Sequence, residues 1–256
     1  MSKFEFIAVS ASDGVATITL NRPPVNILHI PMLAEIETAL DGVGHDPSVA
    51  AIVFNALGKT FSAGVDVADH TPEKTAPMIR VFHSVFRRLA ATDALTIAVV
   101  QGAALGGGCE LACFCDIVLA SDRAKFGQPE VQVGVFPPVA ASVLPFQLGL
   151  KKAVELTVLG ATIDAPEALR IGLANQVFAS EEFSTRTSEY IGQIGRLSRP
   201  VLRLAKKATV AGWRERVLEQ LDRAEKLYLD DLMNLADAHE GIAAFLGKRP
   251  PQWKHA

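Results

Sequence analysis

The stretch Ala104-Leu105-Gly106-Gly107-Gly108-Cys109-Glu110 joins a strand pattern to a helix pattern through three consecutive glycines. The apolar run Ile97–Val100 before it has the length of a buried strand, and the residues after it predict a helix with Glu110 in its first turn. Glycine lets the backbone approach a neighbour or a ligand closely. Because N–H groups at a helix start are unpaired and favoured by the helix dipole, this turn is suited to hold an oxyanion.

Strand and helix patterns alternate on both sides of this turn. Residues 4–9 and 15–20 predict an opening hairpin, because turn-forming residues separate two β-rich runs. The pattern continues with a helix over 32–40, a buried strand over 49–54, a helix with an apolar stripe near 79–89 and a strand over 117–119. Repeated strand, helix, strand order favours parallel strands with crossover helices, so we assign the chain to the α/β class.

Strand patterns nearly vanish after Pro138, and amphipathic helical stretches follow instead. They cover residues 150–159, 165–171, 181–195, 199–213, 214–233 and 236–246. We therefore expect an α/β core with the functional site over residues 1–195 and a helical section over 196–256 that packs against it. The helical section is rich in leucine at 218, 221, 227, 229 and 232. Large apolar helical faces usually mark association between subunits.

The composition narrows the choice of partners. The 256 residues carry 25 Lys plus Arg against 28 Asp plus Glu, a formal net charge of -3, without long runs of one sign. This balance argues against nucleic acid as a partner. Three clustered cysteines, at 109, 113 and 115, do not suit an extracellular disulfide framework and fit a reducing cytoplasm.

No part of the chain is predicted to cross a membrane or to serve as a leader. The uncharged stretch Val131–Leu150 has about the length of a bilayer span. Its prolines at 137, 138 and 145 remove backbone donors and clash with the preceding turn, so we expect a buried loop and a short helix. The N-terminus lacks the apolar segment of a signal peptide and the pattern of a transit peptide, so we expect it to be the mature start.

Several nucleotide, hydrolase and metal motifs fail on spacing. A phosphate-binding loop ending at Gly58-Lys59-Thr60 needs glycine where the chain has Val53. A dinucleotide fingerprint from Gly106 needs a small residue where the chain has Leu111, and a serine-hydrolase elbow around Ser62 lacks its first glycine. Cys109 and Cys113 would share one helix face, but Cys115 points to another and no histidine lies close in sequence, so we interpret the cysteines as buried thiols and assign no metal ligand.

Two further segments complete a candidate site around the glycine turn. Phe61-Ser62-Ala63-Gly64-Val65-Asp66 contains small residues that permit close backbone approach. Phe126-Gly127-Gln128-Pro129-Glu130 supplies a second carboxylate beside a proline-fixed turn. Two carboxylates, an anion-stabilising turn and an apolar roof suit proton transfer on a carbonyl compound. For the glycine run alone, an ordinary tight turn is an equally good explanation.

These segments and the two ends of the chain resemble the crotonase superfamily of enoyl-CoA hydratases and isomerases. Beyond the three segments above, the resemblance is carried by Val15-Ala16-Thr17-Ile18-Thr19-Leu20-Asn21-Arg22-Pro23, Cys115-Asp116, His239-Glu240-Gly241-Ile242-Ala243-Ala244-Phe245-Leu246 and Lys248-Arg249. It covers nearly the whole chain in the right order. It implies a crotonase-like spiral of ββα units with a helical C-terminal section, acting on an acyl-CoA substrate without a separate cofactor. It also implies homotrimers that pair into homohexamers.

The resemblance further implies roles for individual residues. The backbone N–H groups of Val65 and Gly107 hold the thioester carbonyl and stabilise the enolate that forms during catalysis. Glu110 helps to activate the water, and Glu130 handles the proton at the acyl carbon. Because paired carboxylates titrate as a unit, the division of roles between them stays open. Coenzyme A is expected near Ser62, Ala63, Asp66 and Lys248, and the acyl group among His70, Met78, Phe82, Phe86, Phe136 and Pro138.

Departures from the family pattern bear on the substrate. Straight-chain hydratases have Ile-Pro-Gly after the second glutamate, where this chain has Val135-Phe136-Pro137-Pro138-Val139-Ala140-Ala141-Ser142. This segment and Val67-Ala68-Asp69-His70 are most similar to the cyclic dienoyl-CoA hydratases of anaerobic aromatic degradation. An isomerase, a hydrolase and a non-catalytic acyl-CoA-binding or RNA-binding member stay as alternatives, although both glutamates and the negative charge favour a hydratase. Ring or chain substrate, reaction direction, and trimer or hexamer stay open.

Overall fold

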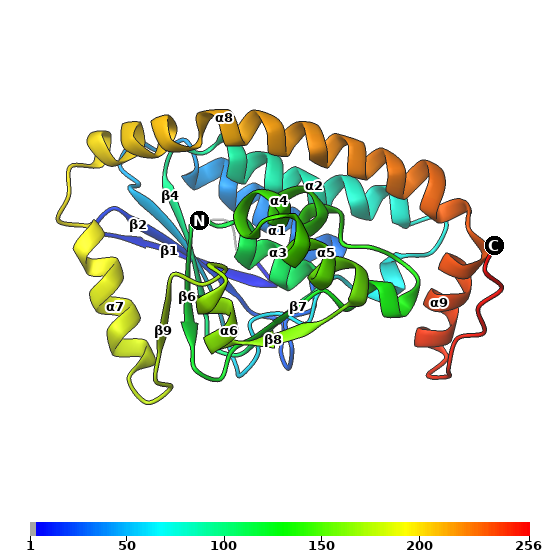
Figure 1. Cartoon of the computed structure of the whole chain (residues 1–256). Coiled ribbons are helices and arrows are strands. Elements are labelled where there is room, and N and C mark those ends of the chain that lie inside the picture. Colours follow the sequence, from blue (N-terminus) through cyan, green and yellow to red (C-terminus); the bar gives the residue numbers. More distant parts are fainter. Residues whose placement is uncertain (1–3) are drawn as a thin grey trace.

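The computed structural model describes residues 4–256, and residues 1–3, part of the expected mature start, lie outside them. Within this range the main sheet has six strands in the order β1-β2-β3-β4-β6-β9 (Figure 1). The strands are β1 (Ile7–Ser12), β2 (Val15–Leu20), β3 (Ala51–Ala56), β4 (Leu95–Val100), β6 (Ile117–Ser121) and β9 (Gln176–Phe178). The opening hairpin is antiparallel and all later pairs are parallel, so the predicted α/β class is confirmed.

A small sheet extends the main one where the functional segments lie. It consists, within the described residues, of β5 (Ala103–Leu105), β7 (Lys125–Gly127) and β8 (Thr162–Asp164). Since β5 directly follows β4 and β7 directly follows β6, this sheet continues from the carboxyl ends of two parallel strands. The carboxyl ends of parallel strands are where α/β folds place their ligands.

The helices fill the connections as the apolar periodicity predicts. They are α1 (Ile30–Val43), α2 (Thr75–Ala91), α3 (Gly107–Phe114), α4 (Pro138–Leu148), α5 (Leu150–Leu159), α6 (Ala165–Arg170), α7 (Phe183–Ile194), α8 (Arg199–Lys226) and α9 (Ala236–Leu246). The predicted bounds of α5 and α9 are confirmed to the residue. The stretches 199–213 and 214–233, expected as two, form one long helix that ends in a π-helical turn, Leu227–Asp231.

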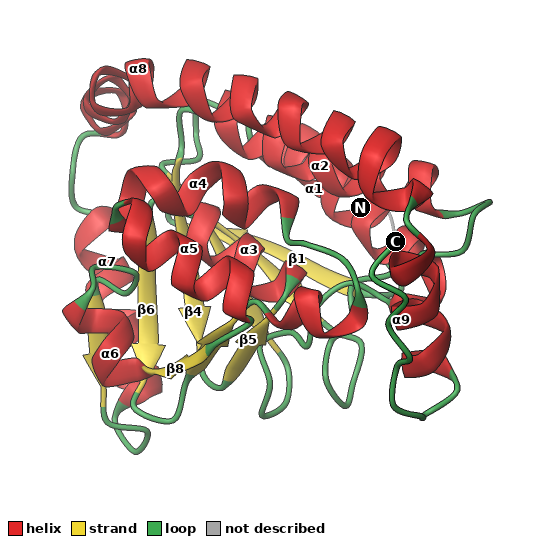
Figure 2. Ribbon diagram, turned by 45° about the vertical axis from the view of Figure 1, so that its right-hand side comes forward, coloured by secondary structure: helices red, strands yellow, loops and turns green. Residues whose placement is uncertain are grey.

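The helical C-terminal section shares the core of the α/β section. The α8 helix runs across α2 and α4, and α9 lies at the opposite end of the molecule from α7 (Figures 1 and 2). Most of the leucines predicted to mark an association face pack instead within their own chain. Leu221 is fully buried, and Leu218, Leu229 and Leu232 pack against the core. Leu227 alone among these five is exposed.

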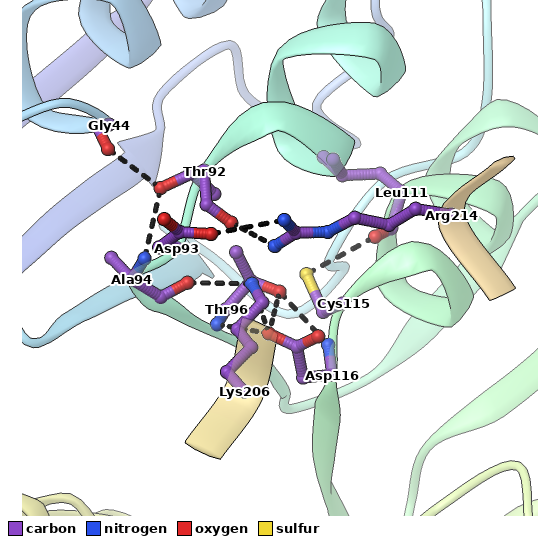
Figure 3. Close-up of polar contacts among 10 residues, drawn as sticks. All are labelled: Gly44, Thr92, Asp93, Ala94, Thr96, Leu111, Cys115, Asp116, Lys206 and Arg214. Carbon is purple, nitrogen blue, oxygen red and sulfur yellow. Dashed lines mark hydrogen bonds and ion pairs between the residues drawn. The ribbon is translucent and has the colours of Figure 1, made fainter. Parts of the chain in front are cut away.

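A buried ion pair fixes α8 to the sheet (Figure 3). Lys206 Nζ lies 2.7 Å from Asp116 Oδ2 and donates to the carbonyl oxygen of Ala94 at 2.7 Å. Asp116 in turn accepts the backbone N–H of Thr96 at 2.7 Å and its hydroxyl at 2.8 Å. About two turns further along α8, Arg214 pairs with Asp93, on the loop between α2 and β4, at 3.0 Å. Every charge in this cluster has a partner, as burial requires.

The three cysteines are free and buried, as predicted. The stretch Val131–Leu150 is divided between the end of a 3-10 turn, a loop and α4, which also matches the prediction. Among residues 4–256, no helix combines the length and the apolar character needed to cross a membrane.

Candidate active site

The glycine turn brings the two predicted loops into direct contact. Gly106 has φ +50° and lets the chain turn from β5 into α3. A Cβ on Gly107 would lie 2.6 Å from Val65 Cγ2, and one on Gly108 would lie 2.5 Å from Ser62 Cβ. Distances this short leave no room for a methyl group. The glycines are therefore required by packing, and the packing places residues 61–66 against the start of α3.

Two backbone N–H groups at this contact have no hydrogen-bond partner within residues 4–256. In the parallel bridge between Leu28 and Val65, the N–H of Leu28 donates to the carbonyl of Gly64, and the N–H of Asp66 donates to the carbonyl of Leu28. The N–H of Val65 therefore points away from the bridge. Gly107 is the first residue of α3, where the helix itself offers no acceptor. Both residues line one cavity. The predicted pair of oxyanion donors is thus brought together at a single wall.

Glu110 lies in the first turn of α3 and is 2% exposed. Its Oε1 accepts the backbone N–H groups of Val139 and Ala140, both at 2.8 Å, at the start of α4. Burial raises the pKa of Glu110 to about 7, although the two N–H groups favour the ionised form. A carboxyl group with such a pKa can both accept and release a proton near neutral pH.

Glu130 faces the same cavity from the 3-10 turn Pro129–Val133. Burial, with the charge of Glu110 as the next cause, raises the pKa of Glu130 well above its usual range. The amide of Gln128 is assigned with its nitrogen toward Glu130, 3.3 Å from both carboxylate oxygens, because the opposite orientation sets oxygen against oxygen. Gln128 is 1% exposed and was not predicted as a site residue. Two carboxyl groups without a cation between them and with raised pKa values are typical of proton-transfer sites.

The cavity has a volume of about 310 Å³. Its wall contains five of the six predicted acyl-pocket residues: His70, Met78, Phe82, Phe136 and Pro138. Phe86 was predicted to line it as well, and this is wrong. Phe86 lies one turn further along α2, fully buried, and packs edge-on between Phe82 and Phe114. It supports Phe82 from behind.

The predicted coenzyme A residues differ in their surroundings. Ser62 is fully buried, and its hydroxyl donates to the carbonyl of Asn26 at 2.7 Å, so its side chain shapes the loop and does not face a ligand. Ala63 is exposed at the cavity. Asp66 is half-buried, 3.6 Å from the guanidinium of Arg22. Lys248 is exposed just beyond α9, outside the cavity wall.

Three cavity residues come from the C-terminal section and were not predicted. They are Tyr228, Ile242 and Phe245. Tyr228 lies in the π-helical turn after α8, whereas Ile242 and Phe245 lie on α9. Ile242 and Phe245 belong to the closing segment that carries part of the family resemblance, but no place in the cavity was predicted for it, and no local motif marks Tyr228. The C-terminal section thus completes the cavity of its own chain.

Residues 10–256 match the enoyl-CoA hydratase/isomerase family. The chain belongs to this family. It is 38% identical over 256 residues to a probable enoyl-CoA hydratase from Mycobacterium leprae, with 99% of each chain covered. It is 36% identical to a cyclohexa-1,5-dienecarbonyl-CoA hydratase from Thauera aromatica, covering 93% of this chain and 92% of that protein.

Solved structures agree with this assignment. A crystal structure of an enoyl-CoA hydratase from Mycobacterium avium subsp. paratuberculosis has a TM-score of 0.87 and 29% identity, covering 98% of this chain and all of that one. The crotonase-like fold predicted from the sequence is therefore confirmed. The relatives also support a hydratase of the lyase class that acts on enoyl-CoA.

Proposed function

We propose that the protein hydrates a conjugated cyclic dienoyl-CoA thioester, with Glu110 and Glu130 as its acid and base. The observation that carries this proposal is the shared cavity of two carboxyl groups with raised pKa values and two unpartnered backbone N–H groups. Isomerisation alone needs one proton-transfer group, and addition of water needs a second to activate the nucleophile.

In the proposed reaction the thioester oxygen accepts the N–H groups of Val65 and Gly107. Water adds its oxygen to the β carbon, and the negative charge that moves onto the thioester oxygen is stabilised by these two donors. Glu110 assists the water by accepting one of its protons. Glu130 delivers a proton to the α carbon, so that the product is a neutral 3-hydroxyacyl thioester.

The shape of the cavity supports a compact acyl group. Its volume of about 310 Å³ is at the small end of the range for ligand pockets. Phe82 and Phe136 contribute aromatic rings, and Met78 contributes a flexible apolar side chain. A six-membered ring suits such a pocket better than an extended chain. The Thauera aromatica relative carries the name of an enzyme for a ring of this kind.

The test compares crotonyl-CoA with cyclohexa-1,5-diene-1-carbonyl-CoA, without added cofactor, by the loss of absorbance of the conjugated thioester. We expect kcat/KM for the cyclic substrate to exceed that for crotonyl-CoA by at least about tenfold, the range that pocket fit provides. Faster hydration of crotonyl-CoA contradicts the cyclic substrate. Double-bond migration without water uptake, followed by mass spectrometry, contradicts hydration and supports an isomerase.

The same proposal includes the coenzyme A site and the assembly. We place the nucleotide near Ala63, Asp66 and Lys248, where Arg22 adds a second cation beside Asp66. We propose a homotrimer or homohexamer in the cytoplasm. Support comes from exposed apolar side chains on α5 and at the start of α8: Leu150, Val154, Val158, Leu159, Leu197, Val201 and Leu204. A stable monomer in sedimentation contradicts the assembly.

A further inference from the structure

Tyr228 combines deep burial with a place in the wall of the reaction cavity. It is 1% exposed, and it lines the cavity that contains Glu110 and Glu130. Its ring packs edge-on against Phe136, with centroids 5.2 Å apart at 63°. This contact accounts for an aromatic ring at the position. It does not account for the hydroxyl, because phenylalanine would pack in the same way.

Within residues 4–256 no side chain or backbone group hydrogen-bonds the Tyr228 hydroxyl, and its oxygen is not among the polar atoms that are sealed off without a partner, so it opens onto the cavity that the residue lines. A tyrosine hydroxyl in an apolar wall normally takes a hydrogen-bond partner, and the cavity is where such a partner can lie. Besides burial, the charges of Glu130 and Glu110 both raise the pKa of Tyr228. The phenol therefore stays neutral, keeps its proton to donate, and lies within electrostatic reach of both carboxyl groups.

The backbone around Tyr228 holds this side chain in place. Tyr228 lies in the π-helical turn Leu227–Asp231. Such turns are rare in proteins as a whole, but many of those that occur lie at functional sites. One turn earlier, Glu225 binds His83 Nδ1 at 2.7 Å and Arg87 at 2.8 Å. His83 is fully buried on α2. The end of α8 is thus tied to α2 just before the chain delivers Tyr228 to the cavity.

We propose that the Tyr228 hydroxyl positions the water that adds to the acyl group. Water has two protons for the two carboxylates and two lone pairs. One lone pair attacks the β carbon, and the other accepts the hydrogen bond from Tyr228. The phenol gives up no proton in the overall reaction. This inference rests on the proposed hydration, and it assigns a third polar group to the reacting water.

The first test is Tyr228→Phe, with Tyr190→Phe as the matched control. Tyr190 lies on α7, half-buried, outside the cavity wall. We expect Tyr228→Phe to lower kcat for hydration about tenfold, the value of one hydrogen bond to the reacting water, with KM within about twofold of wild type. Tyr190→Phe should leave both constants unchanged. An unchanged kcat in Tyr228→Phe overturns the proposal.

A second readout separates water positioning from general damage to the site. A saturated thioester, butyryl-CoA, exchanges its α proton with deuterium oxide when a carboxylate removes the proton and returns a deuteron. This exchange uses Glu130 and the oxyanion donors but no attacking water. We expect it to be unchanged in Tyr228→Phe. An equal loss of exchange and hydration overturns the role of Tyr228, whereas wild-type protein inactive in both assays overturns the proposed function itself.

Discussion

Two buried charged clusters lie at the two ends of α3, and they are built in opposite ways. Beyond its last turn, Asp116 faces the ammonium of Lys206 and accepts two hydrogen bonds from Thr96 (Figure 3). In its first turn, Glu110 accepts two backbone N–H groups and shares its cavity with Glu130. The described residues that line this cavity include no lysine or arginine.

The comparison distinguishes charged groups that stabilise the fold from charged groups that are suited to proton transfer. In the first cluster groups of opposite charge lie 2.7 Å apart, and this pair fixes α8 to the sheet. In the second, burial raises the pKa of Glu110 to about 7, and burial together with the charge of Glu110 raises the pKa of Glu130 well above its usual range. A pair that is costly to ionise contributes little to folding but is poised to exchange protons. Disrupting the carboxyl pair should therefore lower turnover, whereas disrupting the ion pair should lower stability.

The largest expected effect comes from neutralising the carboxyl pair. Glu110→Gln and Glu130→Gln should each lower turnover by at least about a hundredfold, the size expected for loss of a positioned acid or base. The dissociation constant for an acyl-CoA product, measured by calorimetry, should change little, because the amide keeps the shape of the side chain. Near wild-type turnover in either variant would refute the role of that residue.

Removing an oxyanion donor should have the next largest effect. Gly107→Pro removes the N–H at the first position of α3, where helices tolerate proline, and should lower kcat by about 10²–10³. Gly107→Ala is the matched control, because alanine brings the same crowded Cβ against Val65 as proline but keeps the N–H, so the effect of the N–H is the difference in kcat between the two variants. Circular dichroism checks that both variants fold. Equal activity of the two variants would show that the N–H is not a donor.

Breaking the ion pair should affect stability and leave catalysis unchanged. Lys206→Met leaves the half-buried carboxyl group of Asp116 without its partner cation, which should lower the free energy of unfolding by about 3 kcal/mol in urea titrations. Lys207→Met, at the exposed neighbouring position, should change it little. Wild-type kcat is expected in both. A large loss of kcat in folded Lys206→Met would contradict the separation of the two clusters.

The smallest expected effect is the pH dependence. Because the pKa of Glu110 is about 7, hydration should fall by a few-fold between pH 7.5 and 6.5 as the base becomes protonated, in wild type and in Lys206→Met alike. A rate independent of pH over this interval would argue against Glu110 as the base.

The same pKa has an opposite consequence for folding. Since the carboxyl group of Glu110 holds its proton more tightly in the folded chain, its contribution to stability is present below pH 4.5 and is lost as the pH rises to about 7. The thermal stability of wild type relative to Glu110→Gln should therefore decrease over that interval. A constant difference would show that Glu110 is not buried in solution as it is here.

Much of the fold follows from local patterns. The bounds of α5 are predictable because glycines with positive φ, at 149 and 160, mark both of its ends. The strands β8 and β9 are not predictable, since three residues are too few to show the alternation of a strand. Fusion of two helical stretches into α8 is not evident from the sequence, because Gly212 lies at their junction and glycine is a poor helix former, yet the helix continues through it.

The residues of the candidate site likewise fall into those that the sequence predicts and those that it does not. Glu110, Glu130, Val65 and Gly107 lie beside glycine or proline signals that the sequence displays. Phe86 misleads because a helical stripe continues past the end of the cavity. Tyr228 has no local signal, because only the π-helical turn and its tie to α2 bring it to the site.

Ile242 and Phe245 of α9 form part of the cavity wall. A ligand in the cavity therefore contributes to the local stability of this last helix. A thioester in this cavity would contact both α9 and α2, so opening of α9 would remove part of its contacts. By linkage, the factor by which the ligand slows amide exchange in α9 equals the factor by which an opened α9 weakens binding. Ligand binding and fraying of the last helix are therefore coupled equilibria with one shared coupling free energy.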